Sequence, residues 1–183
     1  EVAVGPSRGG VQVLAQGDEL ALHPSYTASE RLSLIAEERE RLESLAGASV
    51  RGVRFHYLRH DAHATLPELD RLGFAYDSSH GYADRPGMRA GLSFPFRPYD
   101  VAADRPLALL ELPLVVMDAT LAEERYLGLS AEAGLDRAAA VLERAARAGG
   151  TVSVLWHNDR FEPAYARGWD RVYDRLLGWV RER

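Results

Sequence analysis

Several polar residues that can do acid–base or metal chemistry come directly after apolar segments of the chain. Each segment has the composition of a buried strand, and the polar residue stands at its end. The residues are His23, Arg54 with His56, Asp77, Asp118 and His157. In parallel α/β folds the ligand lies at the carboxyl ends of the strands. We therefore expect these residues to share one edge of a parallel sheet and to form the functional site.

Two of the histidines allow different chemistry. His23 offers the neutral imidazole that divalent metals accept, although a metal needs at least two further ligands. A lone histidine at a strand end is also a common hydrogen-bonded structural residue. His157 can act as a general acid near neutral pH. Alternatively, it can close a turn with Asn158 and Asp159.

The arginine and the two aspartates also have a catalytic and a structural interpretation. Arg54 can hold a catalytic carboxylate in place or form an ordinary salt bridge. Asp77 can orient a catalytic group, or it can open an Asx turn with the two serines that follow it. The same two interpretations apply to Asp118.

Two further segments contain residue types that bind ligands. The run His60-Asp61-Ala62-His63 has the residue types of a metal site, but a surface turn before Thr65 explains it more simply. Residues 81–87 include Tyr82 and Arg85, which suit a lid or a loop that stacks on a sugar ring.

The helices that position these residues are predicted from apolar periodicity and capping residues. Thr27 with Glu30 forms a capping-box pattern before a helix that Gly47 ends. Thr65 with Glu68 forms a second such pattern before a short helix. Two longer helices are predicted from Ser130 to about residue 148 and from about residue 163 to residue 180.

Between the helices lie short apolar segments that predict strands. The predicted strands cover residues 11–15, 19–22, 50–55, 74–76, 107–117 (bent at Pro113) and 151–156. Strands that alternate with helices through short connections indicate an α/β fold with parallel strands and right-handed crossovers. No linker or change of composition interrupts the pattern, so we expect a single domain over residues 1–183.

Composition and motifs exclude several classes of function. Of the 183 residues, 46% are hydrophobic, which is enough for a sizeable core, and the net charge of −5 offers no basic surface for nucleic acid. With no cysteine, disulfides and thiolate metal sites are excluded. Gly-x-Ser-x-Gly and Gly-x-Gly-x-x-Gly patterns are absent, which argues against a serine hydrolase elbow and a dinucleotide fold. No apolar run approaches the roughly 18–20 residues of a membrane span.

Five short motifs follow one another over residues 17–165. They are Gly17-Asp18-Glu19-Leu20-Ala21-Leu22-His23-Pro24-Ser25-Tyr26, Gly52-Val53-Arg54-Phe55-His56-Tyr57-Leu58-Arg59, Tyr76-Asp77-Ser78-Ser79, Glu111-Leu112-Pro113-Leu114 with Met117-Asp118, and Leu155-Trp156-His157-Asn158. In this order they resemble the motifs of the polysaccharide deacetylases, the carbohydrate esterases that include chitin-oligosaccharide deacetylases, and most closely those of a divergent bacterial branch.

The resemblance implies a distorted (β/α) barrel of about seven strands and a divalent metal, usually zinc, held by one Asp and two His. It implies a metal-dependent hydrolase that removes acyl groups from an N- or O-acetylated carbohydrate. By position, His23 matches the first metal histidine, Arg54 the arginine that orients the base, and His157 the acid. Asp77 is placed with these catalytic residues. The residues expected to contact the carbohydrate are Tyr57, Tyr82 and Trp156.

The chain also departs from the family pattern. The Asp-Asp motif, which supplies the base and one metal ligand, has no counterpart, so we expect it upstream of Glu1 together with a missing first strand. The second metal histidine, four residues after the first, is Thr27 here. The Arg-x-Pro-Tyr motif has become Arg54-Phe55-His56-Tyr57.

These departures leave three hypotheses open. The first is a carbohydrate deacetylase domain that is complete only with the upstream strand. The second is a non-catalytic relative that binds a glycan or a protein. The third is another α/β hydrolase that acts on C–N bonds. The resemblance implies a bacterial protein of the cytoplasm or the cell envelope, and the sequence indicates neither the compartment nor the oligomeric state.

Overall fold

A computed structural model describes residues 19–182 of the chain. The strand predicted over residues 11–15 lies outside the described residues. The described chain divides into two compact units. Unit 1 comprises residues 19–80 and 95–112, and unit 2 comprises residues 81–94 and 113–182. The prediction of one domain over residues 1–183 stays a prediction.

Unit 1 contains a small parallel sheet whose strand order is β1-β2-β5. These strands are β1 (Gly52–Val53), β2 (Tyr76–Asp77) and β5 (Leu110–Glu111), and all of them pair in parallel. An isolated parallel bridge joins Leu22 to Val53 of β1. The predicted parallel arrangement is therefore confirmed, but the strands are shorter than predicted, and residues 19–22 contribute one bridge instead of a strand.

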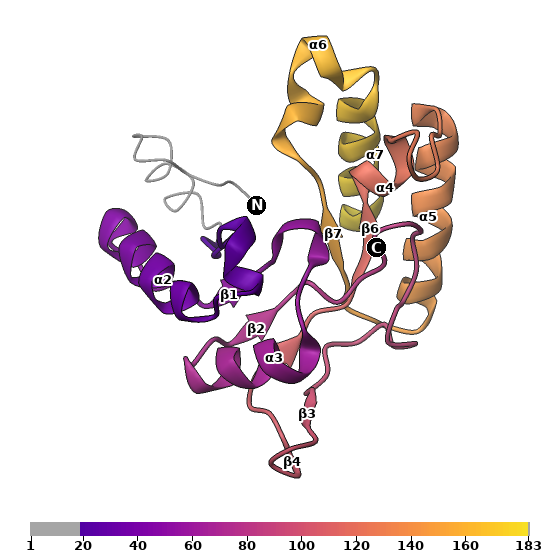
Figure 1. The fold of residues 1–183 in the computed structure, drawn as a ribbon. Coiled ribbons are helices and arrows are strands. Elements are labelled where there is room, and N and C mark those ends of the chain that lie inside the picture. The colour runs from indigo at the N-terminus through magenta and orange to yellow at the C-terminus, as the bar shows by residue number, and fades with distance from the viewer. Residues whose placement is uncertain (1–18, 183) are drawn as a thin grey trace. The chain divides into compact units, whose positions relative to one another are not determined.

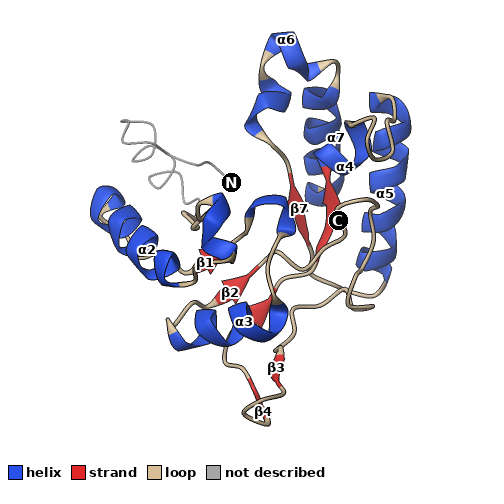
Figure 2. Ribbon diagram, viewed as in Figure 1, coloured by secondary structure: helices blue, strands red, loops and turns tan. Residues whose placement is uncertain are grey.

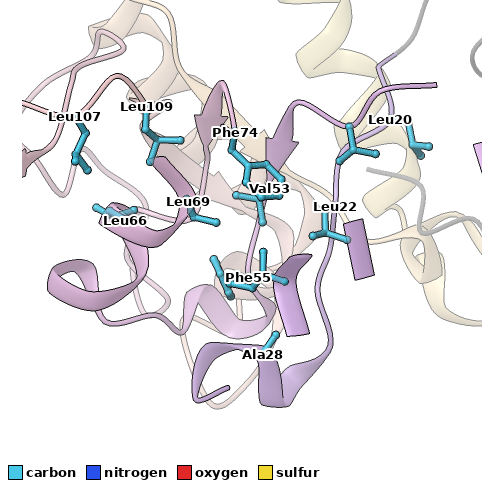
Figure 3. Close-up of a cluster of buried hydrophobic side chains, with 12 residues drawn as sticks. Leu20, Leu22, Ala28, Val53, Phe55, Leu66, Leu69, Phe74, Leu107 and Leu109 are labelled. Carbon is cyan, nitrogen blue, oxygen red and sulfur yellow. The ribbon is translucent and has the colours of Figure 1, made fainter. Parts of the chain in front are cut away.

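Two helices and the buried faces of the strands form the core of unit 1. The helices are α2 (Ser33–Ala46) and α3 (Ala62–Arg71), and the 3-10 turns are η1 (Tyr26–Ser29) and η2 (His56–Leu58). A short antiparallel pair, β3 (Tyr99–Asp100) with β4 (Arg105–Pro106), completes the unit (Figure 1). Figure 3 shows the buried side chains between these elements, which include Leu22, Val53, Phe55, Leu69, Phe74 and Leu109.

Both predicted capping boxes are wrong. Thr27 lies within η1, and α2 begins six residues later, with no side-chain cap. The carboxylate of Glu30 cannot reach back to an N-cap because it pairs with Arg59. The helix α3 begins at Ala62, where the Asp61 side chain accepts a hydrogen bond from the His63 N–H (2.9 Å). Thr65 is consequently a buried residue inside the helix.

Unit 2 combines a parallel strand pair with two long helices (Figure 2). The strands β6 (Leu114–Met117) and β7 (Ser153–Leu155) pair in parallel, as predicted for the segments around them. The helix α4 (Asp118–Ala122) follows β6, and α5 (Ala131–Arg147) packs against α7 (Trp169–Arg181). Where these helices meet, a Cβ on Gly134 would lie 2.4 Å from the Trp169 ring. Glycine at this position therefore allows the indole to pack directly on the α5 backbone.

The ends of the unit 2 helices agree only in part with the sequence predictions. Ser130 caps α5 as predicted, since its hydroxyl accepts from the Ala133 N–H (3.3 Å). The single C-terminal helix predicted from residue 163 is wrong, because the chain forms η3 (Asn158–Phe161), α6 (Pro163–Ala166) and α7. Arg167 and Gly168, with φ of 44° and 89°, adopt left-handed conformations that break the helix between α6 and α7.

The architecture is thus mixed α/β with parallel strands, as predicted. Residues 19–182 form three separate sheets, and none of them closes on itself. The distorted (β/α) barrel implied by the resemblance stays a prediction. No helix in the described part of the chain has the length and apolar character needed to cross a membrane.

Candidate functional site

In unit 1, three of the polar residues gather where the parallel strands end. Arg54 follows β1, Asp77 is the last residue of β2, and Glu111 is the last residue of β5. All three are buried, with relative exposures of 8%, 0% and 1%. The register, Val53 beside Asp77 and Asp77 beside Glu111, accounts for their proximity. The predicted placement of Arg54 and Asp77 at one sheet edge is therefore found in the structure, while their catalytic roles stay predictions.

Hydrogen bonds connect this edge to the loops that follow the strands. Asp77 accepts from the Ser79 N–H (2.9 Å) and the Ser79 hydroxyl (2.7 Å), so it forms the Asx turn anticipated from the sequence. The Ser79 hydroxyl in turn accepts from the Phe55 N–H (2.9 Å). Arg54 Nε donates to the Ser78 hydroxyl (3.0 Å). The side chains at the end of β2 thereby hold the backbone that follows β1.

Glu111 is a buried carboxyl beside a second acidic group. Its Oε1 accepts from the His80 N–H (3.0 Å), and its Oε2 finds no hydrogen-bond partner within residues 19–182. Burial, followed by the charge of Asp77, raises the pKa of Glu111 to about 11. Glu111 is therefore neutral at physiological pH and shares this edge with Asp77 without a second negative charge.

His23 and His56 lie in contact beside the same strands. Their ring centroids are 3.7 Å apart, with a tilt of 44° between the planes. His23 Nδ1 donates to the Arg54 carbonyl (2.6 Å), because a carbonyl can only accept. The neutral ring then carries its lone pair on Nε2. Both side chains are half-buried.

The loops that carry the two histidines are joined by further contacts. Arg59 pairs with Glu30 and donates to the Tyr26 hydroxyl (2.6 Å). The Tyr26 and Tyr57 rings meet edge to face, with centroids 5.9 Å apart. Tyr57 and Leu58 adopt positive φ of 55° and 57°, which non-glycine residues hold only where the surroundings impose it.

Unit 2 holds a second group of polar residues, at the ends of β6 and β7. Asp118 follows β6 and has no solvent exposure. Its Oδ1 accepts from His157 Nδ1 (2.6 Å), and its Oδ2 accepts from Arg160 Nε (2.8 Å). Arg160 also lies 3.6 Å from Glu123. The ring of His157 is 44% exposed, so it can meet a ligand from solvent while Asp118 fixes its orientation.

The environment of His157 favours its protonated form. The hydrogen bond that His157 donates to Asp118 raises the pKa of His157, against the opposing effect of burial. The charges of Asp118 and Asp159 act in the same direction as the hydrogen bond, and Arg160 opposes them. His157 therefore retains its proton to a higher pH than an ordinary histidine.

The remaining predicted site residues have varied surroundings. Tyr57 is 63% exposed next to the histidine pair. Tyr82 stacks under Arg85, whose guanidinium lies 4.1 Å from the ring centroid. Trp156 is buried and packs on Trp169 and Tyr173, so little of its surface faces solvent. The predicted substrate contacts of these residues stay predictions, and so does the sharing of one site by His23, Arg54 and His157, which belong to different units.

No family model matches the chain, and a search of the curated proteins finds no relative. Solved structures do match. A candidate polysaccharide deacetylase from Mycobacterium smegmatis aligns over 91% of the chain with a TM-score of 0.65 at 20% identity. A second candidate, from Pseudomonas aeruginosa PAO1, aligns over 94% with a TM-score of 0.62 at 15% identity. The Puue allantoinase aligns over 94% with a TM-score of 0.64 at 14% identity.

The chain has a polysaccharide deacetylase-like fold. It spans 59%, 56% and 56% of the lengths of these three structures, which is less than two thirds in each case. At such identities the likeness concerns the deacetylase-like fold alone. It confirms, at the level of the fold, the resemblance inferred from the five motifs.

The resemblance of the motifs to those of the polysaccharide deacetylases implies a divalent metal. The imidazole of His23, whose Nδ1 donates to a carbonyl, has the tautomer typical of a metal-binding histidine. Residues 19–182 contain no group of three or more His, Cys, Asp or Glu side chains that could hold a metal. The described residues therefore fit part of a ligand set.

Several of the polar residues at the strand ends of units 1 and 2 received no role in the sequence-based predictions. Arg160 and Glu111 supply buried charge or hydrogen bonding. His56 was expected at the sheet edge with Arg54 and was noted as a change in the arginine motif, but it had no assigned role. A signal for His56 did exist: it lies two residues beyond Arg54, and the strand ends that carry His23 and Arg54 are neighbours. Their sequence separation of 31 hides this proximity from any local pattern.

Proposed function

We propose that the chain is a hydrolase domain of the polysaccharide deacetylase type, which removes acyl groups from an N- or O-acetylated carbohydrate. The observation that carries the proposal is the half-exposed His157, hydrogen-bonded to the buried Asp118, in a chain with a deacetylase-like fold. Hydrolysis breaks the acyl C–N or C–O bond by addition of water. The leaving nitrogen or oxygen must then gain a proton.

His157 supplies that proton in this proposal. Its Nδ1–H stays with Asp118, which leaves Nε2 of the protonated ring to act as the general acid. The raised pKa keeps the ring protonated to a higher pH than that of an ordinary histidine. Arg160 acts as a positioning residue, because it balances the buried charge of Asp118 and donates to the carboxylate oxygen that His157 does not use.

In unit 1, His23 would hold a divalent metal, with zinc as the first candidate. When bound, such a metal acts as a Lewis acid on the acyl oxygen. The Arg54 carbonyl fixes the His23 ring, and the Arg54 side chain is anchored to Ser78. Asp77 fixes Ser79, which holds the backbone after β1. We assign Arg54 and Asp77 positioning roles, and Tyr57 with its neighbour Tyr26 a contact to the sugar.

The test is release of acetate from acetylated carbohydrates. The panel includes N-acetylated chito-oligosaccharides and an O-acetylated oligosaccharide. Allantoin is tested separately, by loss of the substrate because it carries no acetyl group, since an allantoinase shares the fold. We expect acetate release that a chelator abolishes and added zinc restores. His157→Asn should lower the rate about 100-fold to 10,000-fold, whereas Asp174→Asn, an exposed aspartate of α7, should not change it. Full activity of His157→Asn, or no acetate from any carbohydrate with zinc present, would refute the proposal.

The second candidate is a non-catalytic domain that binds a glycan. It is favoured by the lack of a three-residue metal group within residues 19–182 and by the exposed Tyr26–Tyr57 pair. This function predicts binding of an acetylated oligosaccharide that survives both chelator and His157→Asn. Loss of binding in Tyr57→Ala, without any acetate release by the wild type, would favour this candidate over the hydrolase.

A further inference from the structure

The proposed reaction brings a sugar to His157, because the acid protonates the nitrogen or oxygen that stays on the sugar when the acyl group leaves. The sugar ring that carried the acyl group must therefore lie beside His157. An exposed aromatic residue follows His157 closely in the fold of unit 2. His157 is the N-cap of η3, and Phe161, the last residue of this turn, is 46% exposed.

We propose that Phe161 stacks on the pyranose ring that carries the acyl group and so forms, with His157, the sugar subsite of unit 2. This inference rests on the proposed function and deepens it, because it assigns a residue that determines specificity for the carbohydrate. An aromatic ring has a large, flat apolar face. The C–H groups of a pyranose ring form a face of similar size, and both faces lose contact with water when they stack.

Neighbouring rings hold the side chain of Phe161 in its orientation. The Phe161 ring lies at 86° to the Tyr173 ring of α7, with centroids 5.2 Å apart. Tyr173 also packs on Trp156, with centroids 5.6 Å apart. Trp156 directly precedes His157, so a row of three rings connects the residue before the acid to Phe161. The orientation of the Phe161 ring is therefore set before a ligand binds, which lowers the entropic cost of stacking.

The geometry of η3 separates the residues that set the acid from those that face solvent. His157 and Arg160 both bind the Asp118 carboxylate, at 2.6 Å and 2.8 Å. In a 3-10 helix, side chains three residues apart lie on the same face. Asn158 and Phe161, the first and last residues of η3, therefore share a face, and both are exposed. An amide and an aromatic ring together offer hydrogen bonds to sugar hydroxyls and an apolar face to the sugar ring.

Backbone hydrogen bonds fix the distance along the chain between the acid and the aromatic ring. Before Phe161, the Arg160 N–H donates to the His157 carbonyl (3.2 Å). After it, the Glu162 N–H donates to the Asp159 carbonyl (3.1 Å). A sugar that stacks on Phe161 is thereby held at a constant position relative to His157, as proton transfer to its nitrogen or oxygen requires.

The experiment measures binding of the N-acetylated and O-acetylated oligosaccharides to the full chain by calorimetry, together with acetate release. Calorimetry uses the His157→Asn background, so that the substrate is not consumed. Phe161→Leu keeps an apolar side chain but removes the ring, and Phe161→Tyr keeps the ring. Phe94→Leu is the matched control, because Phe94 is also in unit 2 and is 45% exposed. It follows Ser93, which lies against Gly150 before β7, whereas His157 follows this strand.

We expect Phe161→Leu to raise the Kd and the KM about three- to tenfold. The value of kcat should change little, because stacking is equally present in the bound substrate and in the transition state. Phe161→Tyr and Phe94→Leu should each bind as their parent does. Unchanged Kd and KM in Phe161→Leu overturn the inference and leave the proposed function in place where the wild type releases acetate. The same result with an altered oligomeric state also overturns it, and means that Phe161 faces a second copy of the chain.

A measurement on the native residue covers the case in which Phe161→Leu does not fold, as judged by circular dichroism. Nuclear magnetic resonance detects contacts between the ring protons of Phe161 and the C–H protons of the bound sugar. The chain has five phenylalanines, and Phe161→Tyr identifies the signals of Phe161 among them. Bound sugar without such contacts overturns the inference. Contacts without acetate release support the stacking and refute the hydrolase, whereas a wild type that binds neither oligosaccharide overturns both.

Discussion

Replacement of Asp118 by asparagine tests the electrostatics of the unit 2 site. Asparagine keeps the shape of the side chain but removes the charge that receives hydrogen bonds from His157 and Arg160. Each charge-assisted hydrogen bond contributes about 1.5–3 kcal/mol, and asparagine retains one acceptor oxygen. Because the His157 ring is 44% exposed, its hydrogen bond to Asp118 contributes a free energy near the lower end of this range. We expect Asp118→Asn to lower the free energy of unfolding by about 2–3 kcal/mol.

The chain offers a selective assay for this loss. Its three tryptophans, Trp156, Trp169 and Trp179, all belong to unit 2, so tryptophan fluorescence during urea unfolding reports on that unit. For a protein of this size the expected loss corresponds to a fall in Tm of about 4–12 °C. Asp174→Asn serves as the control, since its side chain is exposed on α7.

The pH dependence sharpens the test of the same variant. The folded-state pKa of His157 is raised, so its stabilising contribution is complete below the ordinary histidine value of about 6.5 and disappears as the pH rises through the folded-state value. The stability difference between wild type and Asp118→Asn should therefore shrink between pH 6 and pH 9. The part of the stability difference that comes from the Arg160–Asp118 pair should remain at the higher pH. A difference within about 0.5 kcal/mol of zero at pH 6 would refute the assignment of a buried, charge-bearing Asp118.

Three further substitutions test the packing and charge of both units. Glu111→Gln should leave unit 1 as stable as the wild type at pH 4 and more stable at pH 8, since the raised pKa of Glu111 makes its carboxyl increasingly unfavourable above the ordinary value of 4.5; circular dichroism during urea unfolding measures this. Gly134→Ala should lower the free energy of unfolding by about 1–3 kcal/mol, because the new methyl overlaps the Trp169 ring; tryptophan fluorescence measures it. Asp70→Ala should cost about 1.5–3 kcal/mol in unit 1, because its carboxylate accepts the N–H groups before β5 and pairs with Arg105; circular dichroism measures it.

Each of these substitutions has an outcome that contradicts its reasoning. A Glu111→Gln variant that is less stable than the wild type at pH 8 would show that the carboxyl is ionised in the folded chain. Unchanged stability in Gly134→Ala would mean that the α5–α7 contact can move apart without cost. For Asp70→Ala, wild-type stability would exclude a role of this side chain in holding the segment before β5, and Asp61→Ala would then serve to check that a lost N-cap of α3 is detectable.

The sequence predicted strand ends well and helix starts poorly, for physical reasons. Strand ends such as Asp77 and Asp118 follow buried apolar runs, and burial leaves a strong pattern in composition. A capping box depends on one side chain reaching one N–H. That contact fails when a distant residue competes, as Arg59 does for Glu30. The pattern at Thr65 fails because Asp61, four residues earlier, caps the helix first.

Within the candidate site, residue types were predictable and contacts were not. A histidine at position 157 after an apolar strand indicates an acid, and its aspartate partner could be named only as an ambiguous strand end. The bond between His157 and Asp118 spans 39 residues and depends on the pairing of β6 with β7. The His23–His56 contact likewise depends on the pairing of strands that are far apart in sequence.

The order in which the chain visits its two units has a practical consequence. Residues 81–94 leave unit 1 to join unit 2, and the chain then returns for residues 95–112. Within unit 2, residues 81–94 are held by a hydrogen bond that the Gly87 N–H donates to the Val115 carbonyl (2.8 Å). Neither unit can therefore be obtained by a single cut in the gene. A fragment that begins at residue 113 would lack residues 81–94 and would leave the Val115 carbonyl of β6 without its hydrogen bond from Gly87. Circular permutation would be the safer route to an isolated unit 2.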